Sequence, residues 1–78
     1  MELTAFIDEL VKNVFTSTPR EAVKGGTEYM ELDEWSSLTA FSLISFIERT
    51  YGKKLLLPEL LQAQTLEELY SIINGYHV

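Results

Sequence analysis

The 78-residue sequence contains no cysteine, only two prolines and four glycines, and a single histidine, His77. The absence of cysteine excludes disulfides, thiolate metal sites and thiol nucleophiles, while it leaves the redox compartment undetermined. No partner for a serine nucleophile is evident, and the acidic residues form neither a paired-carboxylate site nor a metal-ligand cluster. The pair Gly25-Gly26 lacks the other residues of a phosphate-binding loop. We therefore expect a protein that is not an enzyme.

Basic residues are also few, with six lysines and arginines against twelve aspartates and glutamates and a formal net charge of −6. This charge repels nucleic acid and anionic membranes, and it suits basic surfaces on partner proteins. No apolar run approaches the roughly 20 residues of a membrane-spanning helix. The first residues lack the basic and apolar segments of a signal peptide. We expect a cytoplasmic protein that binds other proteins but neither nucleic acid nor membrane.

Apolar residues recur at helical spacing in three segments, and no segment alternates as a strand would. Residues 2–15 predict a first helix. Residues 16–34 include Pro19 and have no sustained period, so they predict an unusually long loop. The second half of this loop contains apolar residues expected to pack on the core and acids expected to be solvated. The first set is Tyr29, Met30, Leu32 and Trp35, and the second is Glu28, Glu31, Asp33 and Glu34.

The next helix is expected over residues 37–51, with Ser36-Ser37 at its start and Gly52 at its end. On a helical wheel, Leu38 falls outside the apolar arc and Phe41 lies at the arc's edge nearer Ser37. Phe46 flanks the opposite edge. Leu38 and Phe41 are therefore expected beside Ser37. The arc itself, expected to face the core, consists of Ala40, Leu43, Ile44, Ile47 and Tyr51.

Two further helices are expected in the last third of the chain. After an extended stretch, a short helix covers residues 58–62 with Pro58 at its first position. Thr65 and Glu68 then have the spacing of a capping box that opens a last helix, which Gly75 ends. The predicted fold is a single all-α domain over residues 1–78, a monomeric bundle of three longer helices and one short helix.

Ser37-Leu38 opening a long helix that ends at Tyr51-Gly52 resembles the acyl carrier protein family. In that family an Asp-Ser-Leu motif begins the second helix, and its serine carries a 4′-phosphopantetheine arm. The resemblance covers most of the chain, in the order of the helices and the long loop, and it implies that Ser37 is the attachment site. The chain departs from the family at Ser36, where aspartate is usual. Both residue types are good N-caps, so the exchange keeps the helix start and removes one negative charge.

The resemblance implies a non-catalytic carrier that holds acyl intermediates as thioesters on the arm. It would present them to partner enzymes of fatty acid, polyketide or related biosynthesis, after loading by a phosphopantetheinyl transferase. Its other partners would be acyl-transferring, ligase or synthase enzymes. Two alternatives stay open. One is an aminoacyl or peptidyl carrier, whose motif usually has glycines where this chain has Trp35-Ser36, and the other is a carrier-like interaction module that is never modified.

Partners of this family dock along the second helix, usually through its acids, but here that helix contains one acid, Glu48. We therefore expect Asp33 and Glu34 of the loop to steer basic partners. Leu38 and Phe41 would supply a desolvated apolar anchor beside the arm. The alternative is that Phe41 packs inward and Leu38 covers the loop.

Overall fold

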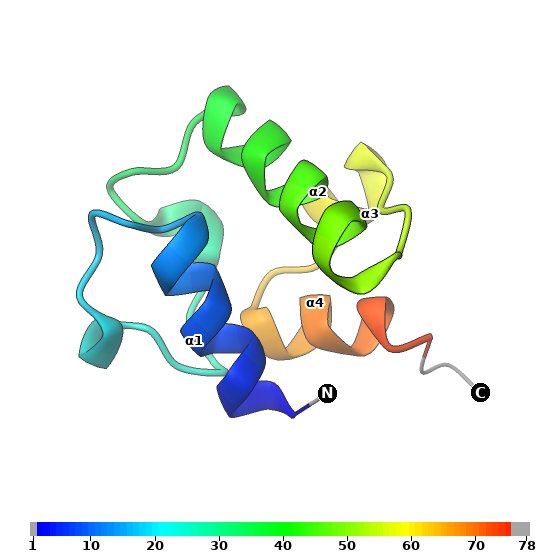
Figure 1. Ribbon diagram of the computed structural model, residues 1–78. Helices are drawn as coiled ribbons and strands as arrows, with labels where there is room; N and C mark the ends of the chain where they lie inside the picture. The colour runs from blue at the N-terminus through cyan, green and yellow to red at the C-terminus, as the bar shows by residue number, and fades with distance from the viewer. Residues whose placement is uncertain (1, 76–78) are drawn as a thin grey trace.

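The computed structural model describes residues 2–75, which form four α-helices and no strand (Figure 1). The helices are α1 (Leu3–Asn13), α2 (Ser37–Tyr51), α3 (Leu57–Gln62) and α4 (Leu66–Ile73). The long connection from α1 to α2 contains two single turns of 3₁₀ helix, η1 (Arg20–Ala22) and η2 (Tyr29–Glu31). The predicted all-α fold is confirmed, with α3 as the shortest α-helix. His77 lies outside the described residues.

The helices pack in two pairs, α1 against α4 and α2 against α3 (Figure 1). Phe6 of α1 is fully buried where these pairs meet. Its ring centroid lies 5.9 Å from that of Tyr51 and 5.7 Å from that of Tyr70, so Phe6 joins α1 to the end of α2 and to α4. None of the helices within residues 2–75 has the length and apolar character that crossing a bilayer requires.

The buried face of α2 differs from the predicted arc. Phe46, expected at the edge of this arc, is only 5% exposed and belongs to the core. Its ring meets that of Tyr51 edge-on, with centroids 6.0 Å apart and an interplanar angle of 88°. The core face is therefore rotated toward Phe46 and away from Phe41. The buried residues of α2 are Ala40, Leu43, Phe46 and Ile47.

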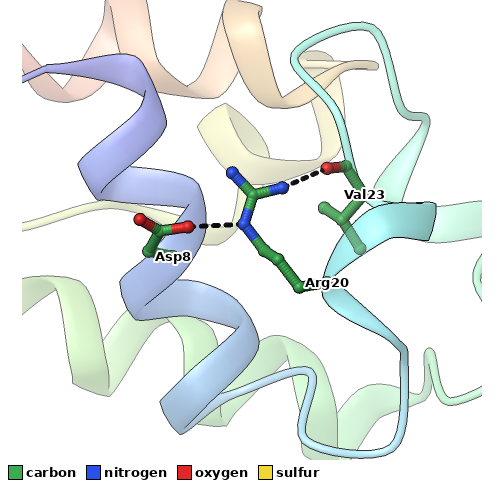
Figure 2. Close-up of polar contacts among 3 residues, drawn as sticks. All are labelled: Asp8, Arg20 and Val23. Carbon is green, nitrogen blue, oxygen red and sulfur yellow. Dashed lines mark hydrogen bonds and ion pairs between the residues drawn. The ribbon is translucent and has the colours of Figure 1, made fainter.

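η1 is tied to α1 through Arg20 (Figure 2). The Arg20 guanidinium donates from Nε to Asp8 Oδ1 at 2.5 Å, and from Nη1 to the Val23 carbonyl oxygen at 2.7 Å. The Arg20 and Asp8 side chains are 40% and 57% exposed, and an ion pair so exposed contributes at most about 1 kcal/mol. The contact therefore positions the first half of the loop more than it stabilises the fold.

The Gly25-Gly26 turn supports the start of α4. The N–H groups of Leu66 and Glu67 donate to the carbonyl oxygens of Thr27 at 3.1 Å and Gly25 at 2.9 Å. The first N–H groups of a helix have no acceptor within the helix, so the loop satisfies two of them. A Cβ atom at Gly25 would lie 2.7 Å from Oε2 of the exposed Glu67 side chain, so a larger residue here would require that side chain to move. The backbone of this turn thus has a structural role.

The observed ends of α3 and α4 lie within one residue of the ends predicted from the sequence. The Thr65 hydroxyl accepts from the Glu68 N–H at 3.2 Å, and the Glu68 carboxylate accepts from the Thr65 N–H at 3.0 Å. The predicted capping box is therefore confirmed. α3 begins at Leu57 instead of Pro58, and Gly75 has a positive φ of 64° just after α4. A glycine in this left-handed conformation is a common helix stop.

Tyr29 in η2 ties the second half of the loop to α3. Its side chain is fully buried, and its hydroxyl lies 2.6 Å from the Leu60 carbonyl oxygen and 2.7 Å from that of Ala63. The last carbonyl oxygens of a helix lack N–H donors within it, so the Tyr29 hydroxyl supplies a donor at the end of α3. Burial, with a smaller contribution from the Glu68 charge, raises the pKa of the Tyr29 hydroxyl far above its ordinary value. The group therefore remains a hydrogen-bond donor at neutral pH.

Candidate functional site

The two adjacent serines at the start of α2 have different roles. Ser36 is the N-cap, with extended backbone, and its Oγ accepts from the Thr39 N–H at 3.2 Å. The Thr39 hydroxyl donates to the Glu34 carbonyl oxygen at 2.6 Å. Because that hydrogen is used, the Ser36 hydroxyl is the donor in its 3.1 Å contact with Thr39 Oγ1. The Ser36 hydroxyl is thus engaged both as donor and as acceptor.

Ser37, the first residue of α2, is exposed, and its hydroxyl has no hydrogen-bond partner within residues 2–75. The N–H groups of Ser37 and Leu38 also find no acceptor in this part of the chain. At α4 the corresponding two donors are bound by loop carbonyls. The start of α2 therefore combines an accessible hydroxyl with free N–H groups at the positive end of the helix dipole, an arrangement that suits a phosphate ester.

An apolar groove of about 180 Å³ lies beside Ser37, between the start of α2 and α3. Leu57 and Leu61 of α3 form one wall. On the other side, the Trp35 ring packs edge-on against the Tyr29 ring, with centroids 5.6 Å apart and an interplanar angle of 64°. The buried Tyr29 therefore holds both Trp35 and α3 in place. The residues that line the groove are Trp35, Ser36, Ser37, Ala40, Phe41, Leu57 and Leu61.

Large apolar side chains are exposed around this groove. Leu38 is 76% exposed and Phe41 is 60% exposed, so the alternative in which Phe41 packs inward is wrong. Three leucines near or in α3 are also accessible. Together these residues form what we call the α2–α3 apolar surface: Leu38, Phe41, Leu56, Leu57 and Leu61. Exposed apolar residues gathered in one region commonly mark interaction sites.

The loop acids are not equally solvated. Asp33 is exposed near the start of α2, as expected, but Glu34 is half-buried. The Glu34 carboxylate accepts from the Ser17 N–H at 3.2 Å and from the Thr18 hydroxyl, so the expectation of a solvated Glu34 is wrong. Glu34 therefore joins the end of the loop to its beginning, and the two joined segments line a larger cavity of about 330 Å³. That cavity does not include Ser37.

Sequence reasoning placed Ser37 beside Leu38 and Phe41, and the structure brings these three together. It missed the contribution of α3, because the pairing of α3 with α2 is a tertiary contact that no local pattern specifies. One signal was available in the leucine run of residues 55–57. Only Leu55 of this run is buried, so the run contains more apolar surface than the core accepts.

Comparison with protein-family models, with curated proteins and with solved structures found no match to this chain. The likeness to acyl carrier proteins therefore depends on Ser37-Leu38, on the order of the helices and on the long loop before α2.

Proposed function

We propose that this protein is an acyl carrier protein and that Ser37 receives a 4′-phosphopantetheine arm. The observation that carries the proposal is the contrast between the two serines. The Ser36 hydroxyl is used in the helix cap, while Ser37 presents a free hydroxyl next to free N–H groups. When attached, the arm supplies a terminal thiol that holds acyl intermediates as thioesters for enzymes of fatty acid, polyketide or related biosynthesis.

Loading forms a phosphodiester at Ser37. A bond forms between Ser37 Oγ and the coenzyme A phosphorus nearest the pantetheine, and the P–O bond within the pyrophosphate breaks. The adenosine bisphosphate half leaves with the electron pair, and the seryl proton passes to the phosphopantetheinyl transferase. The chain's own part is to hold the hydroxyl outward on the first turn of α2. The N–H groups of Ser37 and Leu38 then face the anionic phosphodiester at the positive end of the helix.

Partner enzymes dock on the α2–α3 apolar surface beside the arm. Leu38 and Phe41 provide the desolvated anchor, since both are exposed and adjoin Ser37. α2 itself has one acid, Glu48, which the neighbouring Arg49 offsets, so Asp33 is the exposed acid nearest to the arm along the chain. Asp33 therefore steers basic partners toward Ser37. Glu34 contributes less, because its carboxylate is bonded within the loop.

Intact mass after incubation with coenzyme A and a broad-specificity phosphopantetheinyl transferase tests the proposal. The unaltered chain should gain one phosphopantetheinyl group, and Ser37→Ala should gain none. Ser36→Ala is the matched control: it loses the cap, at a cost of about 1 kcal/mol, but keeps the attachment hydroxyl and should still be modified. Modification of Ser37→Ala, or no modification of the unaltered chain beside a carrier protein that loads, would contradict the proposal.

The serine at position 36 favours a second candidate, a carrier-like interaction module that is never modified. Ser36→Asp separates the two possibilities, because aspartate can accept from the Thr39 N–H as serine does and restores the charge usual in the family. Loading of Ser36→Asp but not of the unaltered chain would identify such a module. An aminoacyl or peptidyl carrier shares the arm, and incubation of the loaded chain with acyl or aminoacyl ligases distinguishes the cargo.

A further inference from the structure

The chain contains two asparagines, and each lies at the end of a helix: Asn13 is the last residue of α1, and Asn74 follows α4 as its C-cap. Both residues are exposed. Each side chain donates from Nδ2 to the carbonyl oxygen four residues earlier, at 2.9 Å in both cases. The two sites therefore differ chiefly in the residue that comes next, which is Val14 after Asn13 and Gly75 after Asn74.

The next residue matters because its backbone nitrogen can attack the side-chain amide of the asparagine. Val14 has two heavy atoms on its Cβ, which crowd this nitrogen, and it is only 9% exposed. Gly75 has no Cβ and is exposed, so the approach to its nitrogen is open. Of the two asparagines, Asn74 is thus the one with an accessible neighbouring nitrogen.

We propose that Asn74-Gly75 is a site of spontaneous deamidation and backbone isomerisation, with water as the co-reactant. The Gly75 backbone nitrogen gives up its proton to water or hydroxide and forms a bond to Asn74 Cγ. The bond between Cγ and Nδ2 breaks, and Nδ2 leaves with the electron pair and takes up a proton from water, so that ammonia is released. The product is a cyclic succinimide.

Water then opens the succinimide at one of its two carbonyl carbons. Breaking the bond between Cγ and the Gly75 nitrogen gives an aspartate in the original backbone. Breaking the bond between the main-chain carbonyl carbon and the Gly75 nitrogen gives an isoaspartate, in which the main chain runs through Cβ and Cγ. In both cases the net reaction consumes one water and releases one ammonia, with no oxidation or reduction.

The cap at the end of α4 slows this reaction in the folded chain. The Gly75 N–H donates to the Ile72 carbonyl oxygen at 3.1 Å, so the attacking nitrogen is held by a hydrogen bond. The Asn74 amide is bonded one turn back, to the Tyr70 carbonyl oxygen. Ring closure requires both contacts to break, which happens when the last turn opens locally. The rate of modification therefore follows the fraying of α4.

Either product weakens the end of α4. A carboxylate at this position lies at the negative end of the helix dipole. An isoaspartate also lengthens the main chain directly after Ile73, which is 2% exposed and belongs to the core. Modified copies should therefore unfold at a lower denaturant concentration than unmodified copies.

Incubation of the chain at mildly alkaline pH tests the proposal. Intact mass should rise by the difference between an amide and a carboxyl group, and peptide fragmentation should place this gain at residue 74. An isoaspartate methyltransferase with a labelled methyl donor measures the isomerised fraction. In guanidinium chloride the reaction should be at least about tenfold faster than in the folded chain, because the cap no longer holds the two reacting groups.

Two variants provide a matched pair. Asn74→Gln should lose the reaction, because the longer side chain has to close a larger ring, whereas Asn13→Gln should react as the unaltered chain does. A gain located at Asn13, or an unchanged rate in Asn74→Gln, would overturn the site.

Two further outcomes would contradict parts of the proposal. Absence of any gain in guanidinium chloride, while a synthetic peptide that contains Asn-Gly reacts under the same conditions, would overturn the site. Equal rates in the folded and unfolded chain would overturn the protection by the cap. None of these measurements involves Ser37, so their outcome is independent of the proposed carrier function.

Discussion

The Tyr29 hydroxyl joins the loop to the end of α3. Because α3 forms one wall of the groove beside Ser37, this contact also holds that wall in place. In Tyr29→Phe the ring stays, but the carbonyl oxygens of Leu60 and Ala63 lose a donor at 2.6 and 2.7 Å. One phenol hydrogen serves both acceptors, so the loss is one buried hydrogen bond and two poorly solvated carbonyls. Such a loss costs about 1–3 kcal/mol. We expect the free energy of unfolding to fall by about 2 kcal/mol, a large fraction of the total for a small domain.

Urea unfolding at neutral pH, followed by far-ultraviolet circular dichroism, measures this change. Tyr51→Phe is the control, because Tyr51 is half-buried and its hydroxyl has no hydrogen-bond partner among the described residues. Its free energy of unfolding should change by no more than about 0.5 kcal/mol. Equal losses in the two variants, or no loss in Tyr29→Phe, would refute the assignment of this stability to the Tyr29 hydroxyl.

The same hydroxyl predicts a pH dependence. Burial raises the pKa of Tyr29 in the folded chain above its ordinary value of 10.0, so the unfolded chain ionises first as the pH rises. The folded state then binds more protons than the unfolded state. The stability contributed by Tyr29 is therefore present below the unfolded pKa and is lost above it, by at most about 1.4 kcal/mol per pH unit. Tyr29→Phe should flatten this decline, and an unchanged slope would contradict the reasoning.

Four further substitutions test the loop and the α2–α3 apolar surface. Gly25→Ala should lower the thermal midpoint, because its Cβ would lie 2.7 Å from Glu67 Oε2, and an unchanged midpoint would show that Glu67 moves away freely. Phe41→Ala should weaken binding of a cognate enzyme by about 1–2 kcal/mol while the free energy of unfolding changes by about 1 kcal/mol or less, since Phe41 is 60% exposed. A large loss of stability with unchanged affinity would exclude Phe41 as an anchor. Asp33→Asn should slow association with a basic partner and flatten the salt dependence of the association rate without destabilising the chain. Glu34→Gln should instead lower the free energy of unfolding by about 1 kcal/mol, because the Glu34 carboxylate contacts the start of the loop. Equal effects of the last two changes on both stopped-flow association and urea unfolding would contradict this division.

Local chemistry predicted the elements whose ends are set by one or two residues. Ser36 and Gly52 bound α2, and Thr65 with Glu68 begins α4, because a cap acts within a single turn of its helix. The exposure of Leu38 also followed from the helical period, since Leu38 lies well outside the apolar arc of α2.

Other features depend on residues far apart in the sequence and could not be predicted in this way. The 3₁₀ turns η1 and η2 are too short to show a period. Phe46 is buried because the Tyr51 ring and the core lie against it, which rotates the inner face of α2 beyond the predicted arc. Glu34 looked like any other loop acid until the start of the loop was placed beside it. The groove at Ser37 likewise exists only because α3 lies against α2.

The bonds from the Leu66 and Glu67 N–H groups to the carbonyl oxygens of Thr27 and Gly25 join segments that lie about half the chain apart. The first turn of α4 therefore cannot complete its hydrogen bonds until the loop has docked, so the start of this helix depends on a contact between residues far apart in the sequence. We expect local opening of the loop to expose these two amides without unfolding the rest of α4. Hydrogen exchange at Leu66 and Glu67 thus measures the docking equilibrium of the loop, while exchange at Leu69, bonded within α4 to Thr65, measures the helix.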